Sequence, residues 1–191
     1  MRQLHEFDEV FDSQETFRII LEAMANPTRI LSVEKAADKL YGDHRAILAV
    51  AMTLLDNETT FFVCGDAALS EQIILLTHAK ESTASDAEFV FVTKDGSMEE
   101  DIEDFMCGTL ENPHKSATVI VEITGEKEDD LVFCGPGIKD HAKICTAKTV
   151  GKAVGLRDAQ VYEYPQGIDF LFLTAAGELF GIPRLVKRQR G

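Results

Sequence analysis

The stretch YPQGIDFLFLTAAGELFGIPR, from Tyr164 to Arg184, decides the fold of this sequence, because it contains an apolar run and a return to a second apolar segment. Apart from Asp169, the run from Ile168 to Leu173 is apolar at both alternating sets of positions, which predicts a strand buried on both faces of a sheet. The small residues of AAGE predict a hairpin to a second strand. The chain therefore contains an inner strand with a neighbour beside it.

Asp169 opens this buried run, and a carboxylate there needs partners, because burying it alone would cost several kcal/mol. Two structural interpretations are open: it caps backbone N–H groups around Gly167, or it pairs with a cation such as Arg184 or Arg18. A role in ligand binding or at an interface is the alternative. Pro183 cannot continue a central strand, so we expect Arg184 at a sheet edge or surface that a partner or an anionic ligand can reach.

Earlier in the chain, short apolar strands alternate with helices, which is typical of an α/β sheet. Asp12 with Glu15 resembles a capping box, and Pro27 ends the helix that follows. The polar linker GEKEDD predicts a hairpin between 117–124 and 131–134, so we expect a mixed sheet. The other predicted elements are helices from about 43 to 55, 69 to 79, 98 to 106 and 146 to 156, and strands at 29–33, 60–64 and 88–92.

Size and composition predict one domain over residues 1–191, with the mixed sheet flanked by helices in three α/β/α layers. The net charge of −14 repels nucleic acid and anionic membranes, so neither is expected as a partner. No apolar stretch approaches the roughly 18 residues of a membrane span. Residues 1–10 carry acidic side chains where a signal peptide would be apolar, so we expect a cytoplasmic protein.

Motifs with recognisable chemistry are few. Cys134, His141 and Cys145 could supply three zinc ligands, but the close pairing and fourth ligand of a structural zinc site are missing, so we expect no metal. The glycines of CGPGIKD follow a predicted strand and could form an anion nest, but the segment lacks a phosphate-loop pattern, and a plain turn is the simpler interpretation. No nucleophile motif is present, so no catalytic residue is predicted.

Five segments, in this order and spacing, resemble the H subunit of the bacterial carbon-phosphorus lyase system: FRIILEAMANPTRI, LLDNET, FMCGTLENPHKSATVIVEI, CGPGI and the opening stretch. Thr28 departs from the family's glycine, which calls into question a backbone geometry that only glycine adopts easily. The residues that match the family's motifs are Phe17, Arg18, Leu21, Ala23, Met24, Pro27, Leu54, Asp56, Thr59, Gly108, Thr109, Gly135, Gly137, Ile138, Pro165, Gly167, Ile168, Asp169, Pro183 and Arg184.

The resemblance implies membership of a multi-subunit complex of organic phosphonate catabolism. That complex displaces adenine from ATP with a phosphonate and keeps the triphosphate, so ATP is its substrate. A separate radical subunit then cleaves the carbon-phosphorus bond. The resemblance also implies a homodimer, the other core subunits of the lyase as partners, and a fold similar to the large domain of pyridoxal-phosphate transferases. No lysine stands out as a Schiff-base candidate, so we expect no pyridoxal phosphate in this subunit.

Both substrates are polyanions, which a chain of this charge is poorly suited to hold alone. We therefore expect an accessory or scaffold subunit of a transferase complex, without activity alone, in which Arg18 and Arg184 donate at most charge-assisted hydrogen bonds at a shared surface. The candidate interface or anion-binding residues are Arg18, Asp56, Thr59, Gly108, Thr109, Gly135, Gly137, Asp169 and Arg184. The alternatives are a standalone small-molecule-binding α/β enzyme and a structural dimer unrelated to phosphonates.

Overall fold

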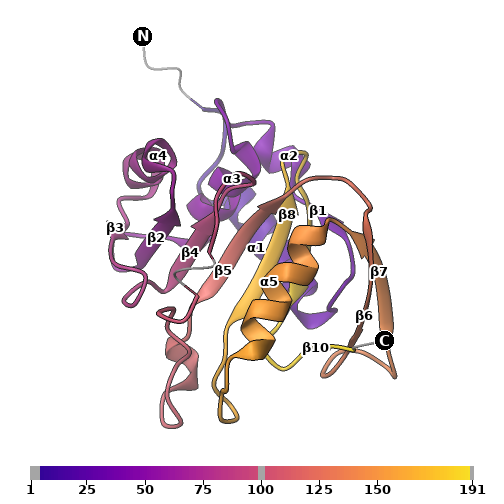
Figure 1. Ribbon diagram of the computed structural model, residues 1–191. Coiled ribbons are helices and arrows are strands. Elements are labelled where there is room, and N and C mark those ends of the chain that lie inside the picture. Colours follow the sequence, from indigo (N-terminus) through magenta and orange to yellow (C-terminus); the bar gives the residue numbers. More distant parts are fainter. Residues whose placement is uncertain (1–4, 99–101, 190–191) are drawn as a thin grey trace.

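The computed structural model describes residues 5–98 and 102–189, with a seven-stranded sheet at its centre (Figure 1). In spatial order the strands are β1 (Leu31–Ser32), β9 (Glu178–Ile182), β8 (Asp169–Thr174), β5 (Thr118–Ile123), β4 (Phe89–Val92), β2 (Thr60–Cys64) and β3 (Lys80–Glu81). From β8 to β3 the strands run parallel, whereas β9 is antiparallel to β8 and to β1. The prediction of a mixed sheet is confirmed.

The inner strand expected from the opening stretch is β8, and AAGE turns the chain into β9 as predicted. Four consecutive side chains, from Phe170 to Leu173, are fully buried. Leu171 and Leu173 belong to the core on one face of the sheet, whereas Phe170 and Phe172 belong to the core on the other. Each of these burials contributes about 1.5–3 kcal/mol, so this strand joins both cores of the protein.

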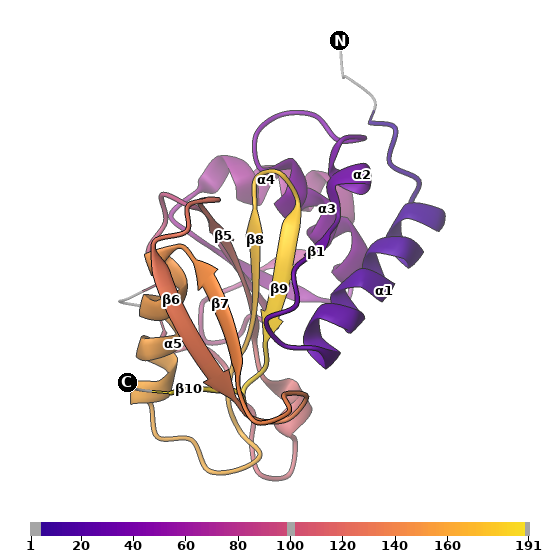
Figure 2. The same cartoon turned by 90° about the vertical axis from the view of Figure 1, so that its right-hand side faces the viewer.

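Helices form one outer layer, with α1 on the right and α4 at the top in Figure 2. They are α1 (Phe11–Ala25), α2 (Glu34–Ala37), α3 (Arg45–Leu54) and α4 (Ala67–Thr77). Residues 46–51 of α3 are all buried, because this helix packs against α1, α2 and α4 as well as the sheet. Its alanines allow that close approach. The predicted helices at 43–55 and 69–79 are confirmed, whereas the short α2 and β3 were not predicted.

The helix α1 follows the predicted start and ends before Pro27, but it leaves large apolar side chains exposed and its cap differs from the predicted one. Phe17 is 45% exposed and Leu21 is 53% exposed. The predicted capping box is wrong, because the N-cap is Val10, which makes no side-chain cap. The carboxylate of Asp12 instead accepts hydrogen bonds of 2.7 and 2.8 Å from the ammonium of Lys39. Asp12 therefore connects α1 to the loop after α2.

The other outer layer combines α5 (Lys148–Ala159) with a three-stranded sheet of β10 (Lys187–Arg188), β6 (Asp129–Cys134) and β7 (Ala142–Thr146) (Figure 2). The predicted three-layer arrangement is confirmed, with this small sheet as an unexpected part of the third layer. The predicted hairpin between 117–124 and 131–134 is wrong. Both edges of β5 already pair with β4 and β8, so β6 crosses to the small sheet and pairs with β7.

The predicted helix at 98–106 is wrong where the structure describes it. Residues 102–104 form a turn and residue 105 a bend, while residues 99–101 lie outside the described residues. Ile102 and Phe105 are nevertheless buried in the core that faces α5. Like charges four residues apart in EEDIED disfavour a helix here. A short 3₁₀ helix, η1 (Pro113–Lys115), then leads into β5.

The turn after α1 has a left-handed backbone at Thr28, the position where the family that the sequence resembles has glycine. Thr28 has φ 70°, and its N–H donates to the carbonyl of Gly181 at 3.3 Å. Left-handed backbone costs a non-glycine residue roughly 1–2 kcal/mol, which a glycine at this position would not pay. The larger conformational entropy of glycine in the unfolded chain offsets part of this stabilisation. We expect Thr28→Gly to raise the free energy of unfolding by up to about 1 kcal/mol in urea denaturation.

The matched control is Thr124→Gly, at an exposed position directly after β5 that has no positive φ. Here glycine brings only its entropic cost, so the free energy of unfolding should fall by about 0.5–1 kcal/mol. Equal losses in the two variants would contradict the assignment of strain to Thr28.

Candidate functional site at the carboxyl edge of the sheet

The parallel strands end at one edge of the large sheet, where the chain leaves β2 and β4 toward opposite faces. After β2 it enters α4, whose Leu69 and Ile73 pack in the core beneath α1 to α4. After β4 it continues to Met98 and Ile102, which pack in the core beneath α5. In open α/β sheets, ligands bind in the crevice at the carboxyl ends of such diverging strands. This edge is therefore the place to look for a site.

Three titratable side chains meet there, and we refer to His44, Asp66 and Glu122 as the carboxyl-edge cluster. The Nδ1 atom of His44 lies 2.8 Å from Oε2 of Glu122, and its Nε2 atom lies 3.4 Å from Oδ2 of Asp66. Glu122 is only 3% exposed, near the end of β5. His44, at φ 58°, is the N-cap residue of α3. The cluster joins three separate segments at one edge.

The same carboxylates hold the surrounding backbone. Asp66 is the N-cap of α4, where its Oδ1 atom accepts a 3.0 Å hydrogen bond from the N–H of Leu69. Oε2 of Glu122 accepts from the N–H of Lys94, after β4, at 3.3 Å. Because both ring nitrogens of His44 already face carboxylates, the imidazole positions these loops rather than facing a ligand.

On the α5 side of this edge, Thr93 and Lys94 line a cavity of about 230 Å³. The lining continues along α5 through Thr149 and Lys152. Within residues 5–98 and 102–189, no group of three or more histidine, cysteine or acidic side chains is arranged to hold a metal ion.

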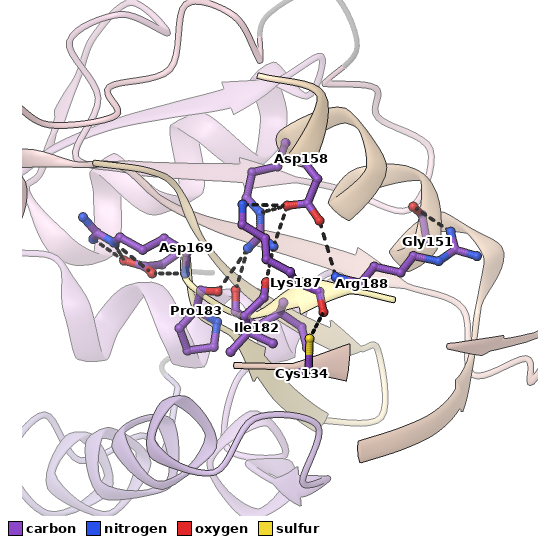
Figure 3. Close-up of polar contacts among 11 residues, drawn as sticks. Cys134, Gly151, Asp158, Asp169, Ile182, Pro183, Lys187 and Arg188 are labelled. Atoms are coloured by element: carbon purple, nitrogen blue, oxygen red, sulfur yellow. Dashed lines mark hydrogen bonds and ion pairs between the residues drawn. The ribbon is translucent and has the colours of Figure 1, made fainter. Parts of the chain in front are cut away.

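A second polar group lies at the opposite, amino edge of β8, where Asp169 pairs with Arg184 (Figure 3). Oδ1 of Asp169 accepts from the backbone N–H of Arg184 at 2.7 Å and from its Nε at 3.2 Å. Oδ2 accepts from Nε at 3.0 Å and also from Nη2. Nη1 of Arg184 donates to the carbonyl of Pro113 at 2.7 Å. Of the partners considered for Asp169, the structure selects Arg184, and the guanidinium is turned inward.

Two family-motif glycines allow this pairing. Gly108 has φ 76°, and a Cβ atom there would lie 2.9 Å from the carbonyl oxygen of Pro113. Gly167 has φ 144°, and a Cβ atom there would lie 2.9 Å from Cβ of Arg184. Gln166 further joins the two loops, donating to the carbonyl of Gly108 at 2.9 Å. Gly108, Asp169 and Arg184 are therefore the predicted site residues that the fold brings together, and their contacts are structural.

The other predicted site residues belong neither to the carboxyl-edge cluster nor to the Asp169–Arg184 pair. Asp56 and Thr59 bond to each other's backbone in the turn before β2. Oγ1 of Thr109 accepts from the N–H of Asn112 in an exposed loop. Arg18 is exposed on α1.

The two glycines of CGPGIKD, which were considered as an anion nest or a plain turn, are held by close packing. A Cβ atom on Gly135 would lie 2.8 Å from the carbonyl oxygen of Leu185. One on Gly137 would lie 2.8 Å from Cδ of Pro27. The segment turns the chain after β6, with the N–H of Ile138 donating to the carbonyl of Gly135 at 3.1 Å. These contacts support the interpretation as a plain turn.

Sequence reasoning missed Arg157, which is fully buried on α5. Its Nη1 donates to the carbonyls of Ile182 and Pro183, each at 3.2 Å, and its Nη2 donates to that of Val186 at 2.6 Å. The neighbouring Asp158 pairs with it at 3.0 Å and lies beside Lys187 and Arg188 in Figure 3. Burial lowers the pKa of the Arg157 guanidinium from its usual value, although Asp158 opposes that shift.

Sequence reasoning also missed His44 and Glu122, and a usable signal existed for only one of them. Glu122 interrupts the apolar run ATVIVEIT in the same way that Asp169 opens its own run, so its burial was foreseeable. His44 is 78 positions from Glu122, and no local pattern connects them.

These features define a three-layer α/β/α protein with a mixed seven-stranded sheet at its centre. The chain belongs to the family described as bacterial phosphonate metabolism protein (PhnH), whose profile matches residues 6–189. It is 32% identical over 190 residues to the alpha-D-ribose 1-methylphosphonate 5-triphosphate synthase subunit PhnH of Rhizobium meliloti (strain 1021). That alignment covers 96% of this chain and 93% of the relative. The family resemblance found in the sequence is confirmed.

Proposed function

We propose that this chain is a subunit of a synthase that transfers a phosphonate to the ribose C1 of ATP with release of adenine. The observation that carries the proposal is the nearly full-length alignment to a relative named as a subunit of alpha-D-ribose 1-methylphosphonate 5-triphosphate synthase. The other subunits of the carbon-phosphorus lyase core are its partners, and ATP is a substrate of the whole complex.

Within that complex the chain acts as an accessory or scaffold subunit. The net charge of −14 opposes the binding of two polyanionic substrates over most of its surface. Arg157 and Arg184 already donate to backbone carbonyls and pair with neighbouring carboxylates. The reacting groups accordingly come mainly from partners, without pyridoxal phosphate in this subunit.

The protein is a cytoplasmic homodimer in this proposal. Apolar side chains on the outer face of α1 support self-association, since Phe11, Phe17 and Leu21 are 74%, 45% and 53% exposed. In the described parts of the chain, no helix has the length and apolar character that crossing a membrane requires.

Co-expression with the other lyase core subunits tests the proposal. A tagged form of this chain should co-purify with them, and only the assembled complex should release adenine from ATP and methylphosphonate. The isolated chain should show no turnover and, in light scattering, the mass of two copies. Failure to assemble would contradict the subunit role and favour an unrelated structural dimer. Turnover by the isolated chain would contradict the accessory role and favour a standalone enzyme.

A further inference from the structure

The strand β7 stands at the free edge of the small sheet. The order β10-β6-β7 places it last, so no strand among the described residues pairs with its outer side. The N–H of Gln189, directly after β10, donates to the carbonyl of Val132 in β6 at 2.8 Å, so Val132 turns its backbone groups toward β10. Because backbone direction alternates along a strand, Leu131 and Phe133 turn theirs toward β7.

The register shows which backbone groups of β7 face outward. The residues opposite Leu131 and Phe133 are Ile144 and Ala142, so these two residues of β7 bond to β6. The N–H and C=O groups of the alternate residues, 143 and 145, therefore point away from the sheet, and both residues are exposed. Such a row of unpaired backbone groups is a template for another strand.

Apolar side chains lie beside this edge. Ile30, just before β1, is 48% exposed, and with Phe180 of β9 it lines a cavity that Cys145 and Thr146 line from β7. The cavity measures about 30 Å³, room for about two water-sized groups and hence for a small apolar side chain. A strand added along β7 would direct every second side chain to this side.

Lys143 sets the charge that such a strand must carry. Its neighbour on β6 is Val132, and it forms no ion pair with any residue that the structure describes. The cavity lining includes Glu126, Lys127 and Glu178, which carry charges of both signs and favour neither. A lysine on an edge strand discourages unspecific pairing. A carboxylate opposite Lys143 would instead form a favourable cross-strand pair.

We propose that the edge of β7 binds an extended segment of a partner subunit by strand addition. The segment carries apolar side chains on the side of Ile30 and a carboxylate opposite Lys143. This inference rests on the proposed function, since the relative is named as a subunit of a synthase. A second copy of this chain does not fit the edge, because its β7, AKICT, has no carboxylate to offer Lys143.

Hydrogen exchange tests the proposal on the unmodified protein, alone and co-purified with the other lyase core subunits, with single amides resolved by mass-spectrometric fragmentation. In the isolated chain the amides of Lys143 and Cys145 should exchange quickly, and those of Ala142 and Ile144 slowly. In the complex only the first two should slow, by about tenfold or more. Protection already present in the isolated chain would show a second copy at this edge, and no protection in the complex would show a free edge. Either result overturns the proposal.

A charge reversal gives the second readout. Lys143→Glu should weaken the affinity for the other lyase core subunits roughly tenfold, because it turns a cross-strand attraction into a repulsion. The matched control is Lys80→Glu, an exposed lysine of the edge strand β3 at the far end of the large sheet, which should change the affinity less than about twofold. Equal weakening by both variants, or none by Lys143→Glu, would contradict the carboxylate partner.

The two proposals fail in different ways. If the complex assembles while the amides of β7 stay unprotected, strand addition at this edge is wrong and the subunit role stands. If this chain does not assemble with the other lyase subunits at all, both proposals are wrong.

Discussion

Replacing Arg157 by methionine should lower the free energy of unfolding by about 3–5 kcal/mol, the largest effect we expect of any single substitution. Methionine fills most of the volume but leaves the carbonyls of Ile182, Pro183 and Val186 without their donor. Each buried acceptor without a partner costs about 1–3 kcal/mol. The guanidinium also lies 5.5 Å from the ring centroid of Phe170, so a cation–π contact is lost as well.

Urea denaturation followed by circular dichroism measures this change. The matched control is Arg29→Met, because Arg29 pairs with Glu22 on the surface, where its side chain is 58% exposed. Surface pairs contribute little, so the control should stay within about 1 kcal/mol of the unmodified protein. A loss below about 1 kcal/mol for Arg157→Met would show that water replaces the guanidinium at these carbonyls.

Replacing Asp169 by alanine should lower the free energy of unfolding by about 2–4 kcal/mol. The side chains of Asp169 and Arg184 are only 15% and 19% exposed, so the variant leaves a poorly hydrated cation without its carboxylate. It also removes the acceptor for the backbone N–H of Arg184. The lower end of the range applies if water reaches the guanidinium.

The control for Asp169→Ala is Asp38→Ala. Asp38 forms an ion pair with Arg45 of 3.2 Å, and its side chain is 61% exposed, so its loss should cost less than about 1 kcal/mol. Co-purification with the lyase subunits gives a second readout. Unchanged stability of Asp169→Ala would contradict the structural role. Unchanged stability with loss of the complex would instead assign Asp169 to an interface, the alternative that the sequence left open.

The parts of the fold that the sequence predicted are those set by local pattern. The apolar run of β8, the AAGE turn and the strands at 60–64 and 88–92 each carry their signal within a few residues. The predicted hairpin of 117–124 with 131–134 was wrong because several strands compete to pair with each edge of a given strand. Two other strands occupy both edges of β5, and nothing within the linker GEKEDD reports on them. Neighbouring strands in sequence are only the commonest choice of partner.

In the candidate site, too, contacts between residues close in sequence could be predicted, whereas contacts between distant segments could not. Chemistry alone required a partner for Asp169, and Arg184 lies only 15 positions away, so that pair could be proposed from sequence. The carboxyl-edge cluster brings together three segments distant in sequence, and the cavity beside it depends on how α5 lies against the loop after β4. Such contacts follow from topology, so no single stretch of sequence contains their signal.

The strand pairings at the sheet edges also bear on how this protein folds during translation. β1 lies early in the chain, yet its hydrogen-bonding partner is β9, and β6 has β10 as a partner on one side. A nascent polypeptide therefore cannot complete either sheet until β9 and β10 have emerged from the ribosome. Native contacts between such distant segments slow folding, so incomplete chains expose strand edges for much of their synthesis.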